Sequence, residues 1–183
     1  MIDAKEQRAI AILDIANAFL HAENDENILM LLRGRLAEMV VQVDPSMYCK
    51  YVTYSSNRQA MLYVRLSKAL YGMLRAALLF YKRLRSDLEN MGFEINPYNP
   101  CVANKMVSGH QMTICWHVDD LKVSHKNEDA VTALALKLAS LYGPNTTIRR
   151  GKVHEYLGME TVAVLASHRT MVTYLLDHWG CKP

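Results

Sequence analysis

Two strand-like runs joined by a pair of adjacent aspartates limit the fold of this chain more than any other feature. The segment reads QMTICWHVDDLKVSH, residues 111–125, with apolar residues on both sides of Asp119 and Asp120. Two strands separated by so short a turn form an antiparallel hairpin. Two like charges at its tip are either ordinary turn residues, since Asp favours turns, or a pair that binds a divalent cation. The hairpin alone leaves both interpretations open.

A third aspartate in a comparable setting favours the cation. The run AIAILDI, residues 9–15, is nearly all apolar and contains Asp14 near its end, which is typical of a strand buried on both faces. An unpaired carboxylate at the edge of a core is costly, so each aspartate is expected to have a partner. Three aspartates from adjacent strands would suit Mg²⁺, which proteins hold with few carboxylates plus substrate phosphates. Spacing alone still leaves a turn at 119–120 and a capping role for Asp14 open.

An amphipathic pattern predicts a long helix over 67–91. Its apolar residues step by four and three positions along one stripe, formed by Leu70, Leu74, Ala77, Tyr81, Leu84 and Leu88. The opposite side carries Lys68, Gly72, Arg75 and Lys82. That basic side is either a solvated face or a surface for a polyanion.

A second helix is predicted over NEDAVTALALKLASLYGP, residues 127–144. Asn127 is a suitable N-cap, acidic residues follow in the first turn, and Gly143-Pro144 ends the pattern. The segment after it, TTIRRGKVHEYLGMETVAV, returns to strand character. The order strand, helix, hairpin, helix, strand predicts an α+β fold with helices packed on an antiparallel sheet.

The overall composition excludes several classes of protein. With 183 residues, of which 51% are apolar and 21% charged, the chain is long enough for one compact globular domain. Its net charge of +3 permits a polyanion partner without requiring one. The four cysteines have no CxxC spacing, which indicates reduced thiols. No apolar run is long enough for a membrane span, and MIDAKEQR lacks the apolar core of a secretory signal. The sequence therefore predicts an intracellular protein that is not secreted and has no membrane partner.

Four short motifs resemble those of reverse transcriptases. LDIANAFL resembles motif A, and KALYG followed by an amphipathic helix resembles motif B of the copia-type retrotransposon branch. HVDDL resembles the YVDD box of motif C, and EYLGME resembles the F-L-G-I-E strand that follows in that branch. The resemblance covers roughly residues 8–163, in the family's order. It implies a reverse-transcriptase palm with a ferredoxin/RRM-like core and partial fingers over 1–163, and a short tail or truncated start of the thumb over 164–183.

The resemblance also implies the residues of an active site. Asp14, Asp119 and Asp120 would be the catalytic, metal-binding aspartates, with the main-chain carbonyl of Ile15 as a further ligand and Mg²⁺, or Mn²⁺ as a substitute, as the metal. The nucleotide site would be lined by Asn17, Ala18, Phe19, Tyr71 and Gly72. Phe19 would exclude a 2′-hydroxyl, and Gly72 would allow close approach of the backbone.

Contacts to nucleic acid would come from the basic side of the 67–91 helix and from the hairpin. Lys68, Arg75 and Lys82 would contact the template backbone by charge, and His117 would lie near the primer end. This sequence departs from the family at two places. His117 replaces the usual Tyr of the YxDD box, and MLRAALLFY lacks the Pro and Arg that commonly follow the motif B glycine.

The function implied is that of an RNA-directed DNA polymerase fragment of a retrotransposon polyprotein. Its partners would be an RNA or DNA template with primer, deoxynucleoside triphosphates and the rest of the polyprotein, in cytoplasmic particles or the nucleus. Because little sequence precedes motif A or follows EYLGME, whether the chain is active alone stays open. Two alternatives remain: a non-catalytic nucleic-acid-binding relic of RRM-like fold, for which Trp116 on the central strand is a candidate stacking residue, and a relic without selected function.

Overall fold

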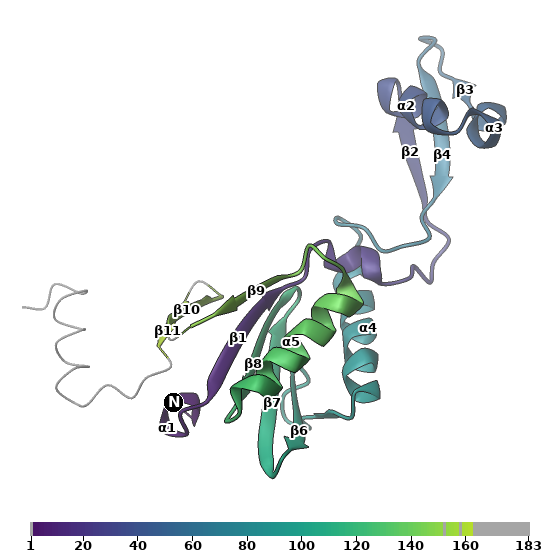
Figure 1. Ribbon diagram of the computed structural model, residues 1–183. Helices are drawn as coiled ribbons and strands as arrows, with labels where there is room; N and C mark the ends of the chain where they lie inside the picture. Colours follow the sequence, from purple (N-terminus) through teal and green to yellow (C-terminus); the bar gives the residue numbers. More distant parts are fainter. Residues whose placement is uncertain (1, 152, 158, 163–183) are drawn as a thin grey trace, which may run out of the picture. The chain divides into compact units, whose positions relative to one another are not determined.

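The computed structural model describes residues 2–151, 153–157 and 159–162 (Figure 1). The chain divides into two compact units, with 1–18 and 84–183 in unit 1 and 19–83 in unit 2. The tail expected at 164–183 lies outside the described residues.

The described elements follow the chain in the order α1 (Ile2–Lys5), β1 (Ala9–Asp14), η1 (Ala18–His21), β2 (Leu29–Arg33), α2 (Arg35–Val43), α3 (Pro45–Tyr48), η2 (Cys49–Tyr51), β3 (Thr53–Tyr54), β4 (Ala60–Arg65), α4 (Ala76–Asn90), β5 (Glu94–Ile95), β6 (Val102–Val107), β7 (His110–His117), β8 (Asp120–His125), α5 (Glu128–Tyr142), β9 (Thr147–Arg150), β10 (Val153–Tyr156) and β11 (Met159–Val162). In this part of the chain, the longest helices, α4 and α5, have 15 residues each, and no helix is long and apolar enough to cross a membrane.

Unit 1 is built on a six-stranded sheet in the order β5-β6-β7-β8-β1-β9. All of its paired strands are antiparallel. Along the chain β1, α4, β7, β8, α5 and β9 form a β-α-β-β-α-β arrangement, and their strands lie in the order β9-β1-β8-β7. This is the ferredoxin/RRM-like core with antiparallel strands that the sequence predicted, so the predicted α+β fold class is confirmed.

One face of the sheet packs against helices α4 and α5, and this face holds the core. Leu13 lies opposite Leu121 in the register of β1 and β8, and both side chains are fully buried. Tyr142 of α5 donates a hydrogen bond from its hydroxyl to the Asp87 carboxylate of α4 at 2.8 Å, so the two helices lie side by side. The opposite face of the sheet, called the open face below, carries Asp120 and Lys122, which alternate with Leu121 along β8.

The second predicted helix is confirmed as α5, and both of its ends lie where the sequence predicted them. The Asn127 side chain accepts hydrogen bonds from the backbone N–H groups of Asp129 and Ala130, as an N-cap does. Gly143 ends α5 with a φ of +97°, a conformation that costs glycine little.

The first predicted helix is correct only over its second part. Helix α4 begins at Ala76, whereas residues 67–75 form turns and an isolated bridge. Gly72 has a φ of +94°, which a right-handed helix excludes, and the side chain of Leu74 is fully exposed rather than part of an apolar stripe. The spacing of the apolar residues therefore predicted a helix that begins too early. Gly72 was the only residue in the sequence that indicated the turn before it.

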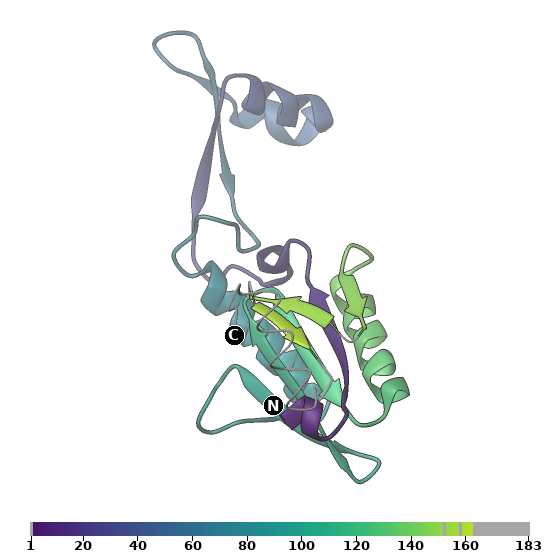
Figure 2. The ribbon, with the colours of Figure 1, turned by 90° about the vertical axis from the view of Figure 1, so that its left-hand side faces the viewer.

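Unit 2 contains a three-stranded antiparallel sheet in the order β2-β4-β3. Ala37 of α2 packs with Ala60 and Leu62 of β4 in a small core, and Leu32 and Val64 lie against it. Helix α2 lies along one side of the ribbon formed by β2 and β4 (Figures 1 and 2). The other side of this small sheet is not covered by α2.

Candidate active site

The structure brings the three predicted aspartates together at one end of the unit 1 sheet. Asp14 is the last residue of β1 and lies directly opposite Asp120, the first residue of β8. Asp119 is in the turn between β7 and β8, and its carbonyl accepts a hydrogen bond from the Ile15 N–H at 3.0 Å. Register and turn thus place the backbone of the three aspartates and of Ile15 at the same end of the sheet.

The charges at this end of the sheet repel one another. Partial burial, and then the negative charges of Asp119 and Asp14, raise the pKa of Asp120 above its ordinary value. Arg149, and then His117, act on the pKa of Asp120 in the opposite direction and do not compensate fully. A site with excess negative charge at neutral pH is suited to a cation.

The three aspartate carboxylates are of the type that binds a hard divalent metal, although their side chains are not yet arranged to coordinate one. In the described part of the chain, no three His, Cys, Asp or Glu side chains are grouped closely enough to hold a metal ion as they stand. Carboxylate oxygens are the ligands that Mg²⁺ and Mn²⁺ prefer, and Mg²⁺ is commonly bound by one or two carboxylates plus phosphates. Metal binding would therefore require the aspartate side chains to rotate toward a common point. The β1–β8 register already places their backbone for this.

The turn that carries Asp119 contains a strained residue. His117 pairs with Asp120, so Val118 and Asp119 form a two-residue hairpin loop. Val118 has a φ of +54°, which is unfavourable for a β-branched side chain. Such loops usually place glycine where a positive φ is needed. Strain of this kind costs about 1–3 kcal/mol and is often found at functional sites.

Replacing Val118 by glycine is expected to stabilise the fold by about 1 kcal/mol, because relief of the strain exceeds the entropic cost of glycine. The measurement is urea unfolding in EDTA. Val102→Gly is the matched control: Val102 lies within strand β6, where glycine is expected to destabilise. Equal destabilisation by both substitutions would show that the turn is not strained.

Two further residues near the aspartates were not identified from the sequence. Arg149 on β9 lies opposite Ile12, two residues from Asp14 on the same face, and its guanidinium is exposed. Tyr156 forms a side-chain hydrogen bond with Cys115 of β7, and burial, then Cys115, raise the pKa of the Tyr156 phenol. Arg149 reaches this place through the long-range pairing of β9 with β1, whereas Tyr156 lies on β10, which pairs only with β11 in a separate two-stranded sheet. The EYLGME motif contains Tyr156, but the resemblance gave this residue no role in the site.

The predicted nucleotide-site residues are in two groups. In unit 2 the rings of Phe19 and Tyr71 lie with their centroids 4.3 Å apart at an interplanar angle of 47°. In unit 1 Ala18 is fully buried, and Asn17 is exposed with a φ of +55°. A Cβ at Gly72 would meet no described atom within 4 Å, and the positive φ of this residue favours glycine. Close approach of the Gly72 backbone to a nucleotide stays a prediction.

The basic residues predicted to share one helix face are not all on a helix. Lys68 and Arg75 precede α4, and only Lys82 lies on that helix, where it is exposed. Lys68 pairs with Glu23 at 3.2 Å, and Arg75 pairs with Asp25 and Glu26. The acidic segment 23–26 therefore offsets much of the charge expected to contact nucleic acid. A nucleic-acid contact by these residues stays a prediction.

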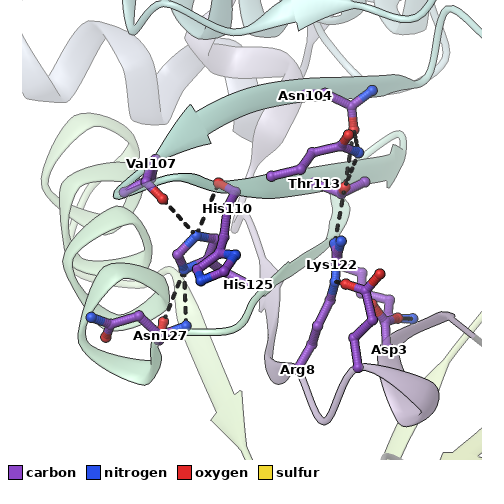
Figure 3. A network of polar contacts seen from close by, with 11 residues as sticks. Asp3, Arg8, Asn104, Val107, His110, Thr113, Lys122, His125 and Asn127 are labelled. Atoms are coloured by element: carbon purple, nitrogen blue, oxygen red, sulfur yellow. Dashed lines mark hydrogen bonds and ion pairs between the residues drawn. The ribbon is translucent and has the colours of Figure 1, made fainter.

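The open face next to the aspartates is a polar network rather than an apolar surface (Figure 3). Lys122 pairs with Asp3 at 2.7 Å, and Arg8 donates a hydrogen bond to Thr113 at 3.3 Å. Thr113 in turn donates to the side-chain oxygen of Asn104 at 2.9 Å. These residues line a cavity of about 590 Å³ in which the main positive and negative charges are paired with each other.

The comparison with solved structures gives similarities of low sequence identity. Apo telomerase from Candida tropicalis aligns at a TM-score of 0.45 and 11% identity, over 86% of this chain and 32% of that chain. Telomerase from the same organism in complex with a fragment of telomeric RNA aligns at 0.45 and 12%, over 86% and 29%. This chain thus spans about a third of those chains. No curated protein matches it.

The comparison with protein families is decisive. The family described as reverse transcriptase (RNA-dependent DNA polymerase) matches residues 1–174, nearly the whole chain and every motif discussed above. The matched region includes strands β1 and β8, whose pairing sets Asp14 opposite Asp120. This chain belongs to the reverse transcriptase family.

Proposed function

We propose that this chain is a copia-type reverse-transcriptase palm with partial fingers, which adds deoxynucleotides to a primer on an RNA or DNA template by two-metal phosphoryl transfer. The observation that supports it most directly is the register of β1 and β8, which sets Asp14 opposite Asp120 beside the turn residue Asp119. The partial fingers would correspond to unit 2. Deoxynucleoside triphosphates and the rest of a retrotransposon polyprotein would be its partners.

The three aspartates would hold Mg²⁺, or Mn²⁺ as a substitute, with the carbonyl of Ile15 as a further ligand. Bound metal ions would supply activation of the primer hydroxyl and stabilisation of the leaving pyrophosphate. The chain's own contribution is positional. The Ile15 N–H holds the Asp119 backbone at 3.0 Å, and the β1–β8 ladder holds Asp14 against Asp120. Arg149 would add positive charge for phosphate oxygens at the same end of the sheet.

The nucleotide would be selected by aromatic side chains of unit 2. The Phe19 and Tyr71 rings lie against each other in a tilted arrangement with centroids 4.3 Å apart, so each ring limits the rotamers of the other. A ring held in this way excludes a 2′-hydroxyl better than a mobile one, because a mobile ring can turn aside. The Phe19 ring would therefore select deoxynucleotides.

Primer extension tests the proposal. The full chain with oligo(dT)-primed poly(rA) and dTTP is expected to lengthen the primer in Mg²⁺ and not in EDTA, as measured on a denaturing gel. Asp119→Asn is the control and is expected to abolish extension. Extension that survives in this variant would contradict the assignment of the aspartates. A folded wild-type chain that extends no primer would contradict the claim that it polymerises by itself.

The RRM-like alternative has less support from the structure. RNA-recognition sheets stack bases on aromatic side chains of their open face. Trp116 is only 4% exposed and pairs with Leu121 on the helix-covered face, so it cannot serve as such a platform. The positions on the open face of β7 and β8 include Thr113, Cys115, Lys122 and Ser124, and the one ring among those positions is the imidazole of His117 at the end of β7.

A further inference from the structure

Two segments of unit 2 that are distant in the sequence lie side by side. We call residues 19–28 and 66–75 the paired segments. An isolated antiparallel bridge pairs Glu23 of the first segment with Lys68 of the second, 45 residues later in the chain. Backbone hydrogen bonds of 3.0 Å on both sides of this bridge run from Asn24 to Ser67, from Ala69 to Ala22 and from Leu66 to Ile28. The two segments therefore behave as one structural element.

Each paired segment carries one ring of the proposed nucleotide site. The centroids of the Phe19 and Tyr71 rings are 4.3 Å apart. Tyr71 is 55% exposed and Phe19 is half-buried, so the core of the unit does not enclose the two rings. Their contact therefore depends on how firmly the paired segments are held against each other.

Ion pairs join the same two segments. Lys68 of the second segment pairs with Glu23 of the first at 3.2 Å. Arg75 of the second segment pairs with Asp25 at 3.1 Å and also with Glu26. Every acidic side chain of the first segment is thus paired with a basic side chain of the second. The ring of the second segment lies between its two basic residues in the chain, so the backbone is fastened both before and after this ring.

The side chain of Asn24 shapes the acidic part of the first segment. Its amide nitrogen donates hydrogen bonds to the carbonyls of Glu26 at 2.8 Å and of Leu66 at 2.9 Å, and its oxygen accepts one from the Glu26 N–H at 3.2 Å. These bonds fix the backbone that carries Asp25 and Glu26 independently of the ion pairs. A single exposed ion pair contributes little, but a guanidinium shared by two carboxylates on a fixed backbone contributes more.

We propose that Arg75, with Asp25 and Glu26, positions the Phe19 and Tyr71 rings and thereby determines how well the nucleotide site rejects ribonucleotides. The inference rests on the proposed function, in which the Phe19 ring excludes a 2′-hydroxyl. Without the ion pairs the second segment can move away from the first, and Phe19 loses the ring that limits its rotamers. Arg75 is a positioning residue that acts through Tyr71. Its guanidinium is bound to two carboxylates and is therefore not available to a template phosphate.

Nucleotide selection tests this role. Extension of oligo(dT) on poly(rA) by the full chain is measured with dTTP and with ribothymidine triphosphate, which differs from dTTP only by its 2′-hydroxyl. The ratio of the two kcat/KM values gives the selectivity. Arg75→Gln is expected to lower this ratio by about threefold to tenfold, the range for loss of a small network of exposed ion pairs. Glu89→Gln is the matched control, because it removes an exposed ion pair with Arg85 on α4 and should leave the ratio unchanged.

Substitution of the carboxylates distinguishes positioning from a template contact. Asp25→Asn with Glu26→Gln removes the same ion pairs and is expected to lower the selectivity by the same factor, and adding Arg75→Gln should have no further effect. A template contact predicts a different pattern: the carboxylate variant frees Arg75 and tightens primer–template binding, Arg75→Gln weakens it, and the selectivity stays constant. That pattern, measured by fluorescence anisotropy and extension, would overturn the inference. Thermal melting checks that all variants are folded.

The ring contact is measured independently of catalysis. With ¹³C-labelled Phe and Tyr, the wild type is expected to show a nuclear Overhauser effect between the rings of Phe19 and Tyr71, which Phe19→Leu identifies by its absence. Arg75→Gln and high salt, which screens exposed charges, are expected to weaken this signal, whereas Glu89→Gln is not. An unchanged signal in Arg75→Gln would overturn the inference. If the wild type extends no primer, the proposed function fails, and the ring contact alone decides whether Arg75 positions the rings.

Discussion

Asp120→Asn is expected to melt at a higher temperature than the wild-type chain in EDTA and to lose primer extension by at least about a thousandfold, because a metal site contributes several kcal/mol to such a reaction. Asp120 lies opposite Asp14 in the ladder, and repulsion from Asp119 and Asp14 adds to burial in raising its pKa. Like charges directly opposite each other in a sheet cost about 0.2–1 kcal/mol, and the neutral amide removes that cost. One substitution should thus improve the fold and destroy the site.

The pH dependence of the stability gain follows from the direction of the shift. The folded chain holds a proton on Asp120 more readily than the unfolded chain does, because the pKa of Asp120 is raised in the fold. At neutral pH the carboxylate is charged, and its repulsion destabilises the folded state. As the pH falls through the raised pKa, protonation relieves the repulsion. The difference in melting temperature between Asp120→Asn and the wild type should therefore shrink toward acidic pH.

Asp129→Asn is the control for charge removal. Asp129 lies in the first turn of α5, where a negative charge interacts favourably with the helix N-terminus. Its replacement should lower stability by a few tenths of a kcal/mol and leave extension intact. Mg²⁺ should raise the melting temperature of the wild type and of Asp129→Asn, but not of Asp120→Asn. A wild type that is more stable than Asp120→Asn in EDTA would show that the aspartates do not repel one another.

Local patterns were sufficient for the parts of the fold that have local causes. The apolar run of β1 predicted a strand whose central residues are buried, and Asn127 with Gly143 predicted both ends of α5. The hairpin with Asp119 in its turn was also predicted, because strand character changes sharply on either side of the aspartates. These features depend on residues that are neighbours in sequence, so a single sequence contains them.

Features that depend on distant pairing were not predictable in the same way. The helix expected from residue 67 begins at Ala76, because the positive φ of Gly72 belongs to a turn whose neighbours pair with segment 22–24. Arg149 was missed, because its nearness to the aspartates depends on the pairing of β9 with β1, 135 residues after Asp14. The common face of Arg33 and Arg65 in unit 2 was missed for the same reason, since these residues share it only through the register of β2 and β4.

His125→Ala is expected to lower the free energy of unfolding by about 3 kcal/mol or more, because it creates a cavity and leaves buried polar groups without partners. The His125 side chain is fully buried at the end of β8. Its Nε2 lies 3.2 Å from the carbonyls of Val107 and of His110, and its Nδ1 lies 3.0 Å from the Asn127 backbone N–H (Figure 3). The ring therefore donates from Nε2 to the β6–β7 turn and accepts at Nδ1 from the N-cap of α5.

The loss would be large relative to the whole stability of a domain, which is about 5–15 kcal/mol. Urea unfolding measures it, and His110→Ala is the matched control. The His110 side chain is exposed, its backbone carbonyl is kept by alanine, and its ring contributes only an edge contact to the His125 ring with centroids 6.3 Å apart. His110→Ala should remain within about 0.5 kcal/mol of the wild type. If both substitutions cost the same, the imidazole of His125 does not connect the turn to the helix, and the hairpin and α5 are held together by apolar packing alone.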